Sequence, residues 1–457
     1  MLLTVLTTLL VAQTQPVLTL EQAFQQAEES NLDLQVARAR LVQADEISAK
    51  VWAGYLPQVS ISGNYTYNSS EAVIALPTGY YIRDVGTTEG QPPAGGEVPG
   101  APTSLIQVPA QFIETEIQKR HMINGTAQLT QGLIIPQLWP AFRNANLAER
   151  AAELSVENAR REILFATAQL YYAAEGLREA VGVQERLLEV NRQHEADAET
   201  RFKVGTVNKV ALLRAQIERA KSEQDLLRTR NAYISAKLAL ATLLNRPMDF
   251  EVTRPTEPAP VGSPEELLDA APRNRPDVLA AQTNLELAEG QRSAVHYKYA
   301  PSVTGIARLN ASNAAGFTGE YTTWTVGAAL NWTLWDGGLR ESELRENAAK
   351  VVENRAAAQQ SELRARQEVQ TAWLELQSAE ANSTKAQEQL RLATENADLV
   401  KASFDAGAAS YLDVVDANAA LTGAELSAIS EELSAQLATL RLAKAAGLFD
   451  PTRGASK

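Results

Sequence analysis

The sequence predicts a mainly α-helical protein of the α+β class, with two tandem structural repeats that each hold two barrel strands and long coiled-coil helices. Two repeated stretches carry this prediction. Adding 202 carries Phe202 to Phe404 and Gly205 to Gly407, and adding 244 carries Tyr55 to Tyr299. A third observation is that long stretches without proline lie on both sides of each turn.

The first repeated stretch predicts a tight turn between two long helices. Gly205 and Gly407 can adopt the left-handed conformation that ends a helix, and Asn208 and Ser410 can cap the helix that follows. The predicted helices cover residues 140–202, 206–245, 338–404 and 410–447. The first is roughly 93 Å long at 1.5 Å per residue. Large aliphatic residues are sparse on these helices and alanine is frequent, which favours thin coiled-coil contacts over a thick core.

The second repeated stretch predicts a helix that gives way to a strand. In Tyr55-Leu-Pro57 and Tyr299-Ala-Pro301 the proline ends the helix, and polar and apolar residues alternate after it. Four strands are predicted, at about residues 57–69, 122–134, 301–310 and 322–335. We expect Val59, Ala127, Val303, Val326 and Leu330 on a lipid face and Thr126, Arg308 and Asn331 on a lumen face.

Aromatic residues suggest that the apolar face meets a membrane. Trp324 and Trp332 fall on one face, roughly 26 Å apart along the strand at about 3.3 Å per residue. Tilt of the strand shortens their separation across the membrane to about 20 Å, which suits the two aromatic girdles of an outer-membrane barrel. Tyr65 and Tyr67 are the matching girdle residues of the first repeat. A sandwich with one solvated face is the alternative. Four strands cannot close a barrel, so we expect a trimer with twelve strands.

The rest of the chain divides around these repeats. Residues 1–12 are apolar and resemble a secretory signal peptide, although the usual basic start is missing. The first repeat covers 13–246 and contains a proline- and glycine-rich loop at 70–121. An equatorial linker at 247–275, a second repeat at 276–447 and a tail at 448–457 complete the chain.

Composition argues against several classes of function. The net charge of −13 disfavours nucleic acid as a partner. Without cysteine the sequence offers no disulfide, thiolate metal site or lipidated cysteine. His121, His194 and His296 are isolated from one another, so we expect no metal site. No catalytic motif stands out, and we expect that the protein binds no cofactor and is not an enzyme.

The chain resembles the TolC-type outer-membrane efflux proteins, also called outer-membrane factors. The resemblance rests on the doubled unit, the Tyr-x-Pro blocks, the two glycine turns and the stretch Tyr411-Leu-Asp413-Val-Val-Asp416-Ala. It implies a trimeric twelve-stranded outer-membrane β-barrel on a long periplasmic α-helical barrel. It also implies a passive exit duct that docks on a periplasmic adaptor (membrane fusion protein) and an inner-membrane pump. The docking turns would contain Gly205, Thr206, Gly407 and Ala408.

The same resemblance marks an entrance. Asp413 and Asp416 match an acidic pair that narrows the channel, and Lys209 and Arg214 of the other turn are candidates for ion pairs with them. Ala409 and Phe404 stand where family members carry an arginine and a tyrosine of a closing network. Two alternatives stay open. One is a soluble periplasmic coiled-coil scaffold or adaptor, and the other is a duct for type I secretion rather than small-molecule efflux.

Overall fold

The computed structural model describes residues 16–84, 96–97, 105–316 and 319–452. The expected signal segment at 1–12 lies outside the described residues. The chain divides into two compact units, whose boundaries fall within four of its helices. One unit holds the described parts of 1–46, 145–289 and 347–457, and the other holds those of 47–144 and 290–346.

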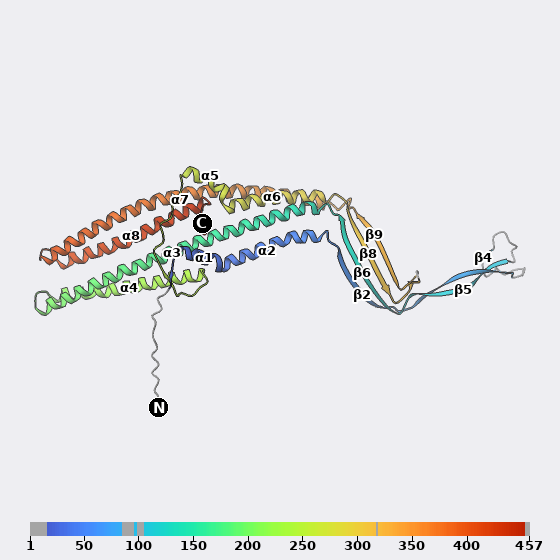
Figure 1. The fold of residues 1–457 in the computed structure, drawn as a ribbon, viewed down its shortest axis with the longest axis horizontal. Helices are drawn as coiled ribbons and strands as arrows, with labels where there is room; N and C mark the ends of the chain where they lie inside the picture. The colour runs from blue at the N-terminus through green and yellow to red at the C-terminus, as the bar shows by residue number, and fades with distance from the viewer. Residues whose placement is uncertain (1–15, 85–95, 98–104, 317–318, 453–457) are drawn as a thin grey trace, which may run out of the picture. The chain divides into compact units, whose positions relative to one another are not determined.

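The helical unit contains two long hairpins. In Figure 1, α4 runs beside α3 and α8 runs beside α7. The four helices are α3 (Leu138–Lys203), α4 (Lys209–Leu243), α7 (Leu339–Asp405) and α8 (Tyr411–Ala445). Both hairpins pair a helix of 66 or 67 residues with one of 35, so the repeat in the sequence is a repeat in the fold. Among the described helices, none combines the length and the apolar composition needed to cross a membrane.

Alanine sets the packing of the long helices. Val351, Ala358, Ala365 and Ala372 of α7 are all buried and follow one another at intervals of seven residues. A buried position at every seventh residue is the repeat of a coiled coil, and small side chains let neighbouring helices approach closely. Leu363 and Leu374 of the same helix stay exposed, so this contact stripe is narrow.

Four shorter helices complete the set. They are α1 (Leu20–Ser30), α2 (Leu32–Ala53), α5 (Pro264–Asn274) and α6 (Pro276–Tyr297). The expected linker at 247–275 is therefore partly regular, because it contains α5 and the short strand β7 (Glu251–Val252). Ser263 caps α5 through a capping box with Glu266, and Pro264 occupies its first turn, where a proline costs no hydrogen bond.

A compact core joins the two ends of the chain. The strand β1 (Val17–Leu18) pairs in parallel with β7, and the Tyr171 hydroxyl lies 2.8 Å from the carbonyl oxygens of Leu18 and Thr253. Phe449 packs edge-on against Phe24 and Phe165, with ring centroids 6.0 and 6.1 Å apart. Residues from α1, the segment after α4 and the chain after α8 thus share one buried cluster.

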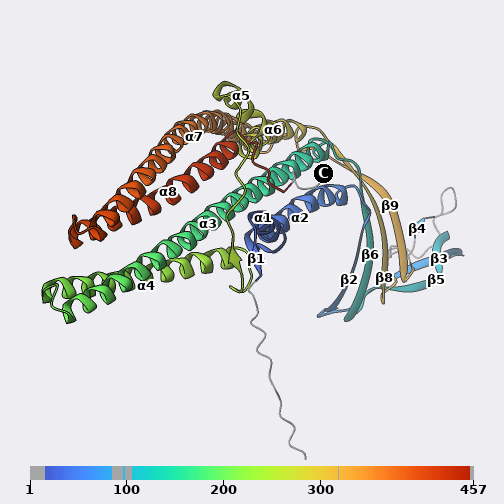
Figure 2. The ribbon, with the colours of Figure 1, turned by 60° about the vertical axis from the view of Figure 1, so that its left-hand side comes forward.

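The other unit contains a four-stranded antiparallel sheet in the order β2-β6-β8-β9. The strands are β2 (Gln58–Tyr67), β6 (His121–Ile134), β8 (Ser302–Ser312) and β9 (Thr322–Asn331). Figure 2 shows that the sheet is strongly curved. In the described part of the chain, β2 and β9 are its two edges.

The last strand ends earlier than the sequence suggests. β9 stops at Asn331 rather than at 335, and its last partner is Ser302. Pro301 comes next on the partner strand and has no N–H to extend the ladder. Trp332 therefore lies just beyond the strand, where its Nε1 donates to the Tyr299 carbonyl at 3.0 Å.

The prediction of a loop at 70–121 was wrong in part. The structure has two long strands there, β3 (Ala72–Asp84) and β5 (Leu105–Gln118), which pair antiparallel and carry the short strand β4 (Gly96–Glu97) at their side. The register shifts at Pro77 and Gly79, where a proline cannot donate to the ladder. The ribbon persists through the shift because bulges absorb irregular residues without ending the pairing.

One glycine in the helical unit is required by close packing. Gly447 follows α8 with a φ of +74°, and an added Cβ would lie 2.8 Å from the carbonyl carbon of Asn274 and 2.9 Å from the nitrogen of Arg275. We expect Gly447→Ala to cost roughly 2–4 kcal/mol of stability, since it combines left-handed strain with overpacking. Thermal unfolding followed by helical circular dichroism measures this. Gly407→Ala is the matched control, because Gly407 has a φ of +79° and open space. Equal losses in the two variants would contradict the packing argument.

Candidate functional site

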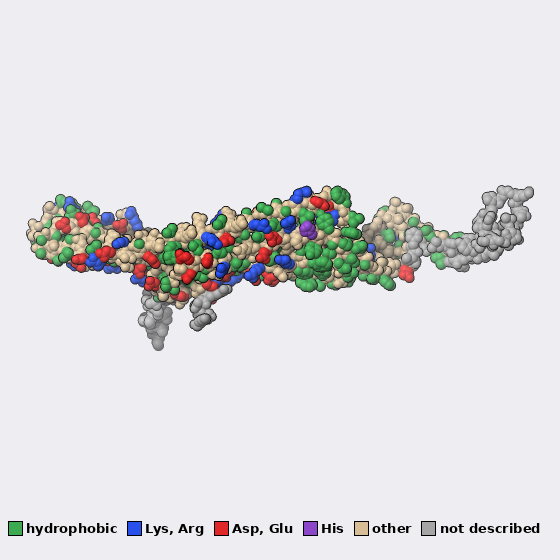
Figure 3. Space-filling view, turned by 90° about the horizontal axis from the view of Figure 1, so that it is seen from above, with side chains coloured by type: hydrophobic (Ala, Val, Ile, Leu, Met, Phe, Trp, Pro, Cys, Tyr) green, Lys and Arg blue, Asp and Glu red, His purple; other side chains and the backbone are tan. Residues whose placement is uncertain are grey.

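The two faces of the four-stranded sheet differ sharply in character. One face carries Val59, Ile61, Val326 and Leu330, whose side chains are 67–83% exposed. In Figure 3, hydrophobic side chains gather in one region of the visible surface, while charged ones are scattered over the helices. Soluble proteins rarely expose an apolar patch that continues across several strands. This face therefore needs a hydrophobic partner such as lipid.

The proposed girdle residues lie on the same apolar face. The register places Tyr65, Tyr67 and Trp324 toward one end of the sheet, and Trp332 follows the other end. All four are 55–76% exposed. The Tyr65 hydroxyl and His121 Nδ1 are 2.7 Å apart, so the polar tip of this ring has a partner while most of the ring stays exposed. Leu334 is similarly exposed, and so is Trp335, which the sequence analysis did not select.

The opposite face of the sheet is polar and internally hydrogen-bonded. Thr126 Oγ1 donates to Asn310 Oδ1 at 3.1 Å, and Gln128 Nε2 donates to Thr130 Oγ1 at 3.1 Å. Arg308 donates from Nε and Nη2 to Gln128 Oε1 at 3.3 and 3.0 Å. A face of this kind is suited to water.

The two helical turns have the same backbone geometry. Gly205 and Gly407 both have a φ of +79°, and each turn is closed by a bond that spans five residues. These bonds are Thr206 N to Arg201 O at 2.9 Å and Ala408 N to Ser403 O at 2.8 Å. The pattern is the Schellman motif, in which a left-handed residue satisfies the last carbonyls of a helix.

The acidic pair of the second turn splits into two roles. Asp413 Oδ2 accepts from the Ser410 backbone N–H at 2.7 Å and from its hydroxyl at 2.8 Å, and these bonds lower the pKa of Asp413. It is thus the reciprocal partner in a capping box. Asp416 is exposed one turn further along. Lys209 and Arg214 are exposed too, and no ion pair joins either to these aspartates within the described chain.

Contacts between the hairpin tips join residues that the sequence analysis did not pair with one another. The guanidinium of Arg201 on α3 lies 5.3 Å from the ring centroid of Phe404 on α7, a cation–π distance. His194 on α3 meets Tyr411 on α8 edge-on at 5.8 Å. Burial lowers the pKa of His194, and the Tyr411 hydroxyl is buried without a hydrogen-bond partner in the described chain.

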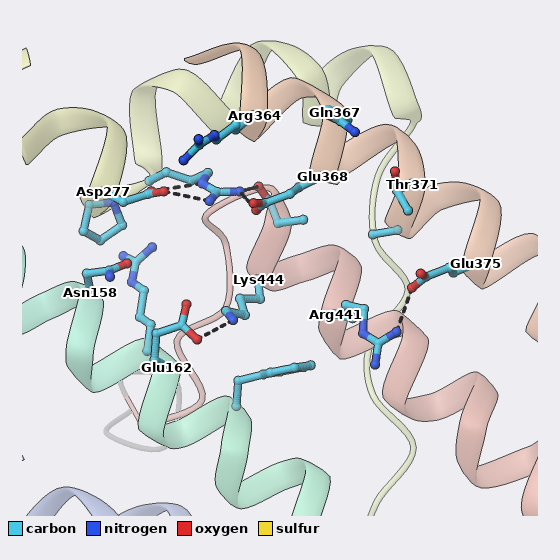
Figure 4. Close-up of a pocket in the computed structure, with 16 residues that line it drawn as sticks. Asn158, Glu162, Asp277, Arg364, Gln367, Glu368, Thr371, Glu375, Arg441 and Lys444 are labelled. Carbon is cyan, nitrogen blue, oxygen red and sulfur yellow. Dashed lines mark hydrogen bonds and ion pairs between the residues drawn. The ribbon is translucent and has the colours of Figure 1, made fainter. Parts of the chain in front are cut away.

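A cavity of about 490 Å³ lies among α3, α6, α7 and α8 in the helical unit. Figure 4 shows the charged side chains around it. Arg275 bonds to Asp277 at 2.8 Å and to Glu368 at 2.5 Å. Two further pairs are Lys444 with Glu162 at 2.7 Å and Arg441 with Glu375 at 2.8 Å. Apart from Arg275 with Asp277, these pairs link segments that are far apart in the chain, so the lining charges serve packing. No cluster of His, Asp or Glu suited to a metal ion occurs in the described ranges.

Comparison with known proteins identifies the family of this chain. The family model described as "Outer membrane efflux protein" matches residues 23–246 and 267–448, which is most of the chain. This chain belongs to the outer membrane efflux protein family. The doubled helix-and-strand unit, the curved sheet and the paired turns are therefore the parts of an efflux protein.

Individual relatives agree with this membership. Nodulation protein T of Rhizobium leguminosarum bv. trifolii is 24% identical over 324 residues, which cover 67% of this chain and 68% of the relative. The probable outer membrane lipoprotein SilC of Salmonella typhimurium is 25% identical over 322 residues, with the same coverage. The crystal structure of the outer membrane protein VceC from Vibrio cholerae superposes with a TM-score of 0.70 over 94% of this chain and 96% of that one, at 20% identity.

Family membership settles the first of the two alternatives, a soluble scaffold or adaptor. This efflux protein is a channel of the outer membrane, and nothing in the comparisons supports a soluble periplasmic scaffold. The fold agrees with this family membership, since the mainly helical chain with its small sheet superposes on VceC over nearly its whole length.

Proposed function

We propose that three copies of this chain close a twelve-stranded β-barrel in the outer membrane and form a passive exit duct. The observation that carries this proposal is the four-stranded sheet with an exposed apolar face, a polar face and two edges, β2 and β9, that pair with no further strand in the described part of the chain. Lipid forbids open sheet edges, so both edges need partners. In this proposal a strand from another copy of the same chain pairs with each edge.

The number of copies follows from the lumen that a duct needs. Two copies would give eight strands, and barrels of about eight strands are filled by their own side chains. Three copies give twelve and leave room for water and solutes. We further propose that Tyr65, Tyr67, Trp324 and Trp332 form the girdles at the lipid surface.

The helical hairpins form the periplasmic part of the duct in this proposal. Their turns at Gly205, Thr206, Gly407 and Ala408 dock on a periplasmic adaptor, which joins the duct to an inner-membrane pump. Asp413 and Asp416 constrict the entrance, with Lys209 and Arg214 as ion-pair partners in a neighbouring turn. Residues 1–12 direct the chain to export. The energy for transport comes from the pump, and this chain catalyses no reaction.

Extraction and conductance test the proposal together. Outer-membrane preparations should retain the protein through washes with concentrated salt and release it only in detergent, because the apolar face is held by lipid. The detergent-solubilised protein should have the mass of a trimer and should form water-filled pores in planar bilayers. Release by salt, or a monomer that conducts no ions, would contradict the proposed duct.

A further inference from the structure

The polar face of the four-stranded sheet carries one isolated positive charge. Arg308 is the only lysine, arginine, aspartate or glutamate in the four strands β2, β6, β8 and β9. The register places Arg308 opposite Gln128 on one side and Thr325 on the other, and Gln128 stands opposite Ser60. A guanidinium therefore stands in a row of uncharged polar side chains.

No carboxylate neutralises this charge. The bonds of Arg308 go to the amide oxygen of Gln128, which is a neutral acceptor. Its guanidinium forms no ion pair with an acidic side chain in the described part of the chain. The guanidinium group is a cation, so each copy of the chain presents a full positive charge on this face.

Gln128 also fixes where the charge lies. The two bonds hold the side chain of Arg308 over the neighbouring strand β6, and Gln128 is in turn oriented by its bond to Thr130. A wall of twelve strands, spaced about 4.8 Å apart and tilted about 40°, has a radius of roughly 12 Å. The guanidinium lies on the inner side of that wall, which places it about 8 Å from the axis.

We propose that Arg308 from three copies forms a cationic ring inside the barrel, which makes the membrane section of the channel favour anionic solutes. The inference rests on the proposed trimeric barrel and adds a selectivity determinant to it. The uncharged polar side chains of this face can bind water and form hydrogen bonds, but they do not discriminate between anions and cations. Arg308 gives the face of these four strands its net positive charge.

The size of the effect follows from screening. The Debye length is about 10 Å at about 0.1 M salt, so charges about 8 Å away act on the whole cross-section of the lumen. Three such charges in water should enrich monovalent anions about threefold at the axis. At about 1 M salt the Debye length falls to about 3 Å, and the preference should almost vanish.

A purely structural role for Arg308 makes a different prediction. If its function were to fix the register of β8 on β6 through Gln128, removal of either partner would impair assembly alike. Ion preference would then follow the amount of assembled trimer and not the charge. Variants that separate the charge from the hydrogen bond distinguish the two roles.

Reversal potentials across planar bilayers in a dilute KCl gradient provide the test. Arg308→Gln should lower the chloride-to-potassium permeability ratio about threefold or more, and Arg308→Lys and Gln128→Leu should keep it because the charge remains. Thr325→Arg adds a second charge to the same row and should raise the ratio. All variants should show equal ratios at about 1 M salt.

The outcomes separate this inference from the function on which it rests. A wild-type protein that forms no trimeric pore overturns the proposed duct. A wild-type pore whose permeability ratio is unchanged in Arg308→Gln overturns the cationic ring and leaves the duct intact. If Arg308→Gln assembles poorly, the comparison of wild type with Thr325→Arg decides the matter, since an unchanged ratio there also overturns the ring.

Discussion

Val326→Arg should largely prevent the protein from entering the outer membrane. Val326 lies in the middle of β9, opposite Ala307, and its side chain is 70% exposed on the apolar face. An arginine near the bilayer midplane of a barrel costs about 2–4 kcal/mol, and a trimer carries that cost three times. The amount of trimer in washed outer membranes, compared by immunoblot, measures the effect.

The adjacent residue offers a matched control. Thr325 belongs to the opposite face and lies beside Arg308 in the register, so Thr325→Arg places the same charge in water. We expect this variant to assemble at nearly the level of the wild type. Equal assembly of the two variants, whether good or poor, would show that the faces of the sheet are not lipid and lumen as proposed.

The strands of the four-stranded sheet were predictable because their pattern is local. Alternation of polar and apolar residues after Pro57 and Pro301 fixes both the strand and its two faces, and a proline marks where each helix must end. The turns were equally readable, since Gly205 and Gly407 need the left-handed conformation that the structure gives them. In these cases one physical requirement decides the conformation of a few neighbouring residues.

The β3–β5 ribbon was not predictable by the same reasoning. Prolines and glycines between 77 and 109 indicate an irregular loop, because each weakens a strand locally. The ribbon forms nevertheless, since pairing between two segments of 13 and 14 residues outweighs single defects and bulges accommodate them. The helix α5 was missed for a related reason, because the expected linker at 247–275 was assigned no helix, whereas Pro264 begins one.

Contacts between the hairpin tips lie beyond sequence reasoning of this kind. Arg201 meets Phe404, and His194 meets Tyr411, across about two hundred residues of chain. No period or motif identifies such pairs, because they depend on the rotation of one long helix against another. The repeat itself was a partial signal, since it placed Phe404 and Tyr411 beside the second turn and so close to the first.

The entrance prediction concerns the acidic pair. In the proposed trimer, three copies of Asp413 and Asp416 bring six carboxylates toward one axis, and clustered carboxylates concentrate cations. We expect divalent or trivalent cations added from the periplasmic side to block single-channel current. The block should weaken as salt rises, because the field is screened. The double variant Asp413→Ala with Asp416→Ala should lose the block, with an apparent affinity about tenfold lower or more.

Capping complicates the role of Asp413 and defines the controls. Its carboxylate holds the Ser410 N–H and hydroxyl, so the double variant also loosens the start of α8. Asp416→Ala alone leaves that cap intact and should still weaken the block. Removal of Lys209 and Arg214 should raise conductance by freeing ion pairs between turns while it preserves the block. If the double aspartate variant kept the block of the wild type, the cations would bind elsewhere, and the entrance would owe its width to the contacts of Phe404 and Tyr411 instead.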